Sequence, residues 1–120
     1  MIKINSIKID TFFYLSEFQC PCCSRVIIHS DLLKYLVKLR NLIREPLFIN
    51  SGFRCIDENK KVGGVEKSYH LFGMAADISV KQKNIMDLAE FAHSIGFKGI
   101  GVYKTFLHLD VREYQEHWEG

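Results

Sequence analysis

The stretch Ser68-Tyr69-His70-Leu71-Phe72-Gly73-Met74-Ala75-Ala76-Asp77 joins a long polar loop to a short apolar strand. Asp77 lies among apolar residues of that strand, where an unpaired carboxylate would be costly to bury, so it needs an arginine, backbone amides or a cation as its partner. Gly73 permits a sharp turn, which allows His70 and Asp77 to point at one place. The stretch therefore predicts a polar site at a buried strand.

A second polar run lies on the strand expected at residues 106–111. Its side chains alternate between the two faces of a sheet, with Leu107, Leu109 and Val111 on one face and Phe106, His108, Asp110 and Arg112 on the other. The aliphatic row is core. The polar row indicates either an exposed sheet face or, with His70 and Asp77, a set of two imidazoles and one carboxylate. That set suits zinc, because three protein ligands leave the fourth tetrahedral position to water.

Hydrophobic periodicity outlines the rest of the chain. It predicts a helix that Ser30 caps and Pro46 terminates, and a second helix from about Gln82 to Ser94 that Gly96 stops. Strands are expected at 47–49 and 75–80, with a terminal hairpin of 100–103 and 106–111 and an extended arm at 2–9. Residues 51–72 form a long loop with one helical turn at 57–62, and the tail from Glu113 shows no period. The predicted fold class is α+β, with two main helices and a small, mostly antiparallel sheet.

Length and composition restrict the partners. A chain of 120 residues, 48% hydrophobic and 25% charged, is typical of one globular domain spanning residues 1–120. No apolar run approaches the ~20 residues that cross a bilayer, and a net charge of +2 is weak support for nucleic-acid binding. The start has no long apolar segment of a secretory signal, so we expect a chain that is cytoplasmic as synthesised. We also expect a monomer, with neither a membrane nor a nucleic-acid partner.

Four cysteines are unevenly placed: Cys20, Cys22 and Cys23 lie together, and Cys55 stands apart. Without an export signal, reduced and buried thiols are the favoured interpretation. A structural metal and a bridge to Cys55 remain the alternatives.

Several motifs together resemble peptidase family M15, which comprises zinc D-Ala-D-Ala carboxypeptidases and peptidoglycan endopeptidases. They are Ser51-Gly52-Phe53-Arg54, Asn59, Val62-Gly63-Gly64, Ser68-x-His70-x-x-Gly73-x-Ala75-x-Asp77, Gly101-x-Tyr103 and His108-x-Asp110-x-Arg112. The resemblance covers about Phe13 to Arg112 and is strongest to the small single-domain kind found in phages. It implies the fold that this family shares with the Hedgehog signalling domain, which keeps a zinc site without an established peptidase role.

The resemblance also implies roles for residues. His70, Asp77 and His108 would bind Zn²⁺, and Arg54 would steady the substrate carboxylate or the developing oxyanion. Ser68 would either brace the ligand loop or contact substrate, and Tyr103 would line a peptide groove unless it serves only packing.

One position departs from the family pattern. Well-studied members carry Asp or Glu three residues before the last zinc histidine, as general base, and this chain has Thr105 there. Asp110 is then the candidate base, or equally the group that orients His108.

The resulting hypothesis is a zinc metallopeptidase that cleaves amide bonds in peptidoglycan stem peptides, as a carboxypeptidase or an endolysin-type endopeptidase. A phage-encoded protein that reaches the wall after release would fit the resemblance. The alternatives are a non-catalytic zinc module that binds cell wall or protein, and a structural protein without metal.

Overall fold

Five strands form one sheet in the computed structural model, which describes residues 4–120. They are β1 (Phe48–Ser51), β2 (Ala75–Ser79), β3 (Gly99–Val102), β4 (Leu107–Asp110) and β5 (Glu116–Glu119), in the order β1-β2-β4-β3-β5. Neighbouring strands are antiparallel except for the parallel pair β3 and β5. The predicted α+β class with a mostly antiparallel sheet is confirmed.

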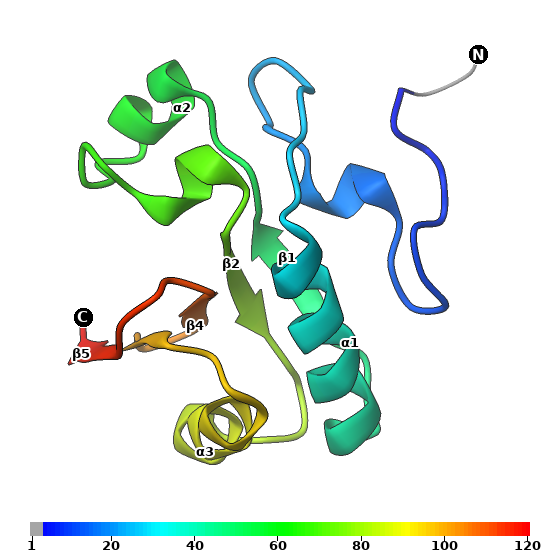
Figure 1. Ribbon diagram of the computed structural model, residues 1–120, viewed down its shortest axis with the longest axis vertical. Helices are drawn as coiled ribbons and strands as arrows, with labels where there is room; N and C mark the ends of the chain where they lie inside the picture. Colours follow the sequence, from blue (N-terminus) through cyan, green and yellow to red (C-terminus); the bar gives the residue numbers. More distant parts are fainter. Residues whose placement is uncertain (1–3) are drawn as a thin grey trace.

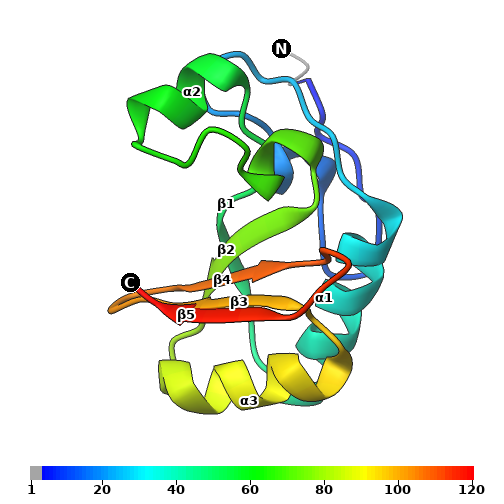
Figure 2. The same ribbon diagram turned by 60° about the vertical axis from the view of Figure 1, so that its left-hand side comes forward.

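Two helices, α1 (Ser30–Ile43) and α3 (Ile85–Ile95), supply the helical side of the core. Figure 1 shows α3 end-on and α1 upright, in contact with each other, and Figure 2 shows α3 beneath the strands. Their buried residues join the inward side chains of the sheet in one apolar cluster: Leu32, Leu36, Leu39, Ile43, Leu88, Ala92, Ile78, Ile100, Leu107 and Leu109. Leu107 and Leu109 thus face the core as their alternation predicts.

The helix starts differ from the expected ones. His29, not Ser30, caps α1: its backbone is extended, and its Nδ1 accepts the N–H of Asp31 at 3.1 Å, whereas Ser30 is already helical. The second helix begins at Ile85 rather than near Gln82, because Asn84 caps it by accepting the N–H of Asp87 at 2.8 Å. Both caps satisfy backbone donors that a helix leaves free at its start.

The long loop 51–72 lies on the opposite side of the sheet from α3 (Figure 2). It contains the predicted helical turn as α2 (Ile56–Lys61) and a 3₁₀ turn, η2 (Tyr69–Phe72). Another 3₁₀ turn, η1 (Leu15–Phe18), packs near β1. The loop therefore covers the sheet face that carries the polar row of β4.

Both ends of the chain differ from expectation. The tail forms β5, which pairs with β3 through its backbone, although only Trp118 among its residues is even half-buried. Of the arm expected at 2–9, Ile2 and Lys3 lie outside the described residues, and the remainder makes one isolated bridge, Lys8 to Tyr14, rather than a strand.

Among the described helices, none combines the length and apolarity that crossing a membrane demands.

Candidate metal centre

Strand register and a 3₁₀ turn bring His70, Asp77 and His108 together. Asp77 on β2 lies directly opposite His108 on β4, so both side chains project from the same sheet face. His70 comes from η2, where the Ser68 hydroxyl accepts the backbone N–H of His70 at 3.2 Å. Gly73 ends that turn in the left-handed conformation, with φ 69°, as glycine readily does. The predicted trio therefore converges, and all three residues are buried.

The hydrogen bonds outside the trio fix which ring nitrogens face inward. His70 Nδ1 lies 2.7 Å from the carbonyl oxygen of Gly52, which can only accept, so Nδ1 carries the proton. His108 Nε2 lies 2.7 Å from Asp110 Oδ2 and donates to it in the same way. In the neutral rings, the unprotonated His70 Nε2 and His108 Nδ1 then lie 3.2 Å and 3.0 Å from Asp77 Oδ1. The lone pairs of two ring nitrogens and one carboxylate oxygen therefore face one another.

This arrangement attracts positive charge. Burial raises the pKa of Asp77, but the hydrogen bonds and positive charge that the His108 and His70 rings supply when protonated outweigh it and lower that pKa well below its usual range. Burial lowers the pKa of His108, but Asp110 and Asp77 on either side raise it above its ordinary value. A proton or a metal ion between these groups would relieve the repulsion of their lone pairs.

The distances fit a zinc ion. Nitrogen and oxygen ligands ~2.0–2.1 Å from zinc at tetrahedral angles lie about 3.3–3.4 Å apart. The observed separations of 3.0 and 3.2 Å are close to that value, and one ligand atom from each residue falls within 4.8 Å of the others. The trio therefore fits the ion that the sequence predicts.

Asp110 is wholly enclosed and has its oxygens occupied. Besides the bond from His108, it accepts three from Arg112: Nε to Oδ1 at 2.8 Å, Nη2 to Oδ2 at 2.7 Å and the backbone N–H to Oδ1 at 3.2 Å. A side chain at Gly99, the cross-strand neighbour of Asp110, would overlap its carboxylate, so glycine there makes the room. Asp110 thus accepts the hydrogen bond from His108 Nε2, the ring nitrogen that faces away from the trio, as carboxylates commonly do for metal-bound histidines.

Arg54 closes the trio on its other side. Its Nη2 donates to Asp77 Oδ2 at 3.0 Å, while Nε donates to Ser51 Oγ at 3.0 Å and Nη1 to Asn59 Oδ1 at 3.3 Å. Its side chain keeps 14% exposure. The guanidinium is therefore held in place beside the trio with part of its surface free.

A hollow of about 520 Å³ opens beside these groups, and Arg54, Ser68, His70, Asp77, Tyr103 and His108 line it. Tyr103 stacks on Phe106 with ring centres 4.5 Å apart, and its hydroxyl accepts the Trp118 Nε1–H at 2.9 Å. Thr105, three residues before His108, is exposed and does not contribute to the lining.

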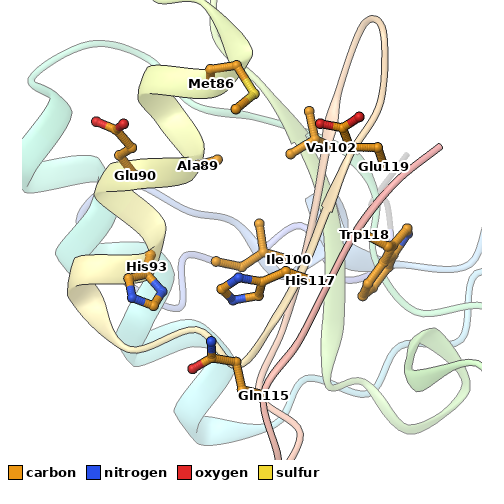
Figure 3. Close-up of a pocket in the computed structure, with 10 residues that line it drawn as sticks. All are labelled: Met86, Ala89, Glu90, His93, Ile100, Val102, Gln115, His117, Trp118 and Glu119. Carbon is orange, nitrogen blue, oxygen red and sulfur yellow. The ribbon is translucent and has the colours of Figure 1, made fainter.

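A second hollow, of about 570 Å³, lies between α3 and the C-terminal strands (Figure 3). His93 and His117 meet edge to face there, with ring centres 5.3 Å apart, and no part of the trio lines it. Five of its ten lining residues are apolar, and neither group of metal-ligating side chains found among residues 4–120 lies there, so the first hollow is the candidate site.

Sequence reasoning missed two aromatic residues of the tail, Tyr114 and Trp118, which line the first hollow. Trp118 packs beside His108 with ring centres 5.1 Å apart, and the Arg112 guanidinium lies over Tyr69, Tyr114 and Trp118 at 4.5–5.6 Å. A lone tryptophan in an aperiodic tail was the only available signal.

Comparisons with known proteins agree with this geometry. A 56-residue segment, 47% of this chain, is 38% identical to the zinc D-Ala-D-Ala carboxypeptidase of Streptomyces albus G. That segment spans 22% of the length of the Streptomyces protein. The family model described as Peptidase M15 matches residues 12–110, which include every residue of the trio and its surroundings up to Asp110. The chain belongs to the peptidase M15 family.

Proposed function

We propose that this chain is a zinc-dependent peptidase that hydrolyses an amide bond in the stem peptides of peptidoglycan. The observation that carries the proposal is the convergence of His70 Nε2, Asp77 Oδ1 and His108 Nδ1 beside an open hollow. The similarity to a zinc D-Ala-D-Ala carboxypeptidase supports both the ion and the substrate class.

Zinc bound by the trio would lower the pKa of a water molecule to ~7 and polarise a carbonyl. The chain's own groups then define the reaction site. Gly52 and Asp110 hold the two imidazoles in the tautomers that present lone pairs inward. Ser68 braces the turn that carries His70, which favours the bracing role over substrate contact.

In this proposal, Arg54 binds a negatively charged group of the substrate. Its planar fork is already oriented by Ser51 and Asn59, and it faces the same hollow as the trio. A guanidinium held this way suits a stem-peptide carboxylate or the charge that develops on the scissile carbonyl oxygen. Tyr103 forms part of the wall against which the peptide would lie.

The test is incubation of zinc-loaded protein with purified peptidoglycan, with new amino groups counted and fragments identified by mass spectrometry. We expect hydrolysis that stops on chelation, returns with zinc and is absent in His70→Ala. His93→Ala is the matched control, because this histidine lines the other hollow, and it should cleave at the normal rate.

A non-catalytic zinc module is the second candidate. Within residues 4–120, Asp77 is the one carboxylate that lines the hollow, and Thr105 is exposed. Folded protein that holds one zinc at the trio, sediments with peptidoglycan and releases no amino groups would establish this function instead.

A further inference from the structure

Four thiols from two distant segments converge outside the trio. The Sγ atoms of Cys20, Cys22 and Cys55 lie 3.5 Å (Cys20 to Cys22), 3.6 Å (Cys20 to Cys55) and 3.1 Å (Cys22 to Cys55) apart. Cys23 adds a fourth sulfur, and all four Sγ atoms lie within 4.8 Å of one another. Cys20 and Cys55 are buried as predicted, but Cys22 and Cys23 are exposed.

These separations are closer to the edges of a metal tetrahedron than to the length of a disulfide bond. Four sulfurs ~2.3 Å from zinc lie about 3.8 Å apart, whereas bonded sulfurs lie ~2.05 Å apart. The cysteines are free, and the three closest pairs share sulfurs, so no division into two bridges accounts for the cluster.

The backbone is arranged to present the sulfurs. A tight turn follows Cys20: its carbonyl accepts the N–H of Ser24 at 2.9 Å, and Ser24 adopts the left-handed conformation with φ 63°. Backbone N–H groups also point at two sulfurs, from Cys55 to Cys20 Sγ at 3.5 Å and from Glu58 to Cys55 Sγ at 3.4 Å. Such donors stabilise negative sulfur.

We propose that Cys20, Cys22, Cys23 and Cys55 bind a structural zinc ion, separate from the ion of the trio. Four thiolates fill the tetrahedral positions and leave none for water or substrate, so this centre holds the fold and performs no catalysis. Binding releases the thiol protons to solvent. The ion fastens the loop at Cys20–Cys23 to Cys55, which is adjacent in sequence to Arg54.

The test uses the full-length, reduced protein reconstituted with zinc or cobalt(II). Two zinc ions per chain are expected in the wild type and one in His70→Ala. The cobalt form of His70→Ala should show the intense near-ultraviolet charge-transfer band that thiolate ligands give. In the wild type the same band should be present, so the readout does not depend on that variant.

Cysteine variants complete the test. Because Cys22 and Cys23 are exposed, the double variant Cys22→Ser/Cys23→Ser is the one most tolerant of substitution, and it should lose the band and one zinc while keeping the other. Ser94→Ala, an exposed serine on α3 away from both sites, is the control and should keep both ions. A wild-type protein without the thiolate band, or with disulfides detected by mass under non-reducing conditions after aerobic purification with zinc, would overturn the proposal.

Discussion

Asp110 shows at the scale of one residue how burial constrains a role. A general base must reach the proton that it removes, whereas the oxygens of Asp110 already accept from His108 and Arg112. The contacts favour the orienting role among the two that the sequence leaves open.

Asp110→Asn separates these roles. If Asp110 orients His108, the variant should bind zinc ~10–100-fold more weakly and recover most of its activity in excess zinc. If Asp110 is the base, a loss of at least ~10²-fold persists at saturating zinc. Zinc titration paired with peptidoglycan hydrolysis measures both, and Asp57→Asn, an exposed acid on α2, is the control.

The same carboxylate predicts an acid-dependent contribution to stability. Burial raises the pKa of Asp110, but hydrogen bonds from Arg112 and His108 outweigh it and lower the pKa to about 2, from an ordinary 3.8. Because the native state binds fewer protons than the unfolded state in this window, the contribution is complete above pH ~4 and is lost as the pH falls through about 2. It amounts to roughly 2 kcal/mol.

Urea unfolding of the chelated wild type and of Asp110→Asn, from pH ~5 to ~2, measures this contribution. The stability difference between the two proteins should shrink on acidification. A constant difference would show that Asp110 keeps an ordinary pKa in the fold.

Arg54→Lys tests the binding of a negatively charged substrate group by Arg54. Lysine keeps the charge but cannot reproduce the fork that joins Ser51, Asn59 and Asp77, so kcat/KM should fall ~10²-fold. Substrates with free and amidated carboxylates show which charge the arginine meets. If it binds the carboxylate, amidation penalises the wild type far more than the variant; equal losses on both substrates assign Arg54 to the oxyanion instead.

At the scale of elements, the pairing of β3 with β4 can be tested at Gly99, which lies opposite Asp110. A methyl group at Gly99 would overlap the Asp110 carboxylate, so Gly99→Ala should displace it and leave Arg112 and His108 without their partner. We expect a destabilisation of ~1–3 kcal/mol and weakened zinc binding. Calorimetry and zinc titration measure these, and Gly63→Asn is the control, since Gly63 has open space and a φ of 73° that asparagine tolerates.

Elements with a buried apolar stripe were predictable, and those held by backbone pairing were not. Leu107 and Leu109 alternate toward the core, which identifies β4 and places His108 on the opposite face. By contrast, β5 pairs with β3 while Glu116, His117 and Glu119 stay exposed, so no side-chain pattern marks it. The N-terminal arm alternates yet forms a single bridge, because alternation does not supply a partner strand.

The candidate site divides in the same way. His70, Asp77 and His108 were identifiable from their motif, and cross-strand pairing confirms that Asp77 and His108 are neighbours. The packing of Trp118 on His108 depends on the position of β5. Because no side-chain pattern in the sequence predicts β5, the position of Trp118 could not be predicted either.

At the scale of the whole molecule, residues Ser51–Cys55 touch both proposed metal centres. The carbonyl of Gly52 orients His70, Arg54 binds Asp77, and Cys55 belongs to the thiol cluster. A register shift between Ile49 and Ser51 bends β1 where this segment begins, so its position depends on contacts further along. An ion at the thiols would therefore order the segment that shapes the trio.

This connection predicts thermodynamic coupling between the two ions. Since an ordered segment lowers the cost of binding at either end, zinc at the thiols should raise the affinity of the trio by about 5-fold or more, and linkage requires the reverse effect to be equal. Cobalt(II) titration of the trio in the wild type and in Cys22→Ser/Cys23→Ser measures the first factor, and loss of the cobalt–thiolate band on dilution of the wild type and of His70→Ala measures the second. Equal affinities with and without the other centre would mean that the segment is already rigid without metal, and that the two ions act independently.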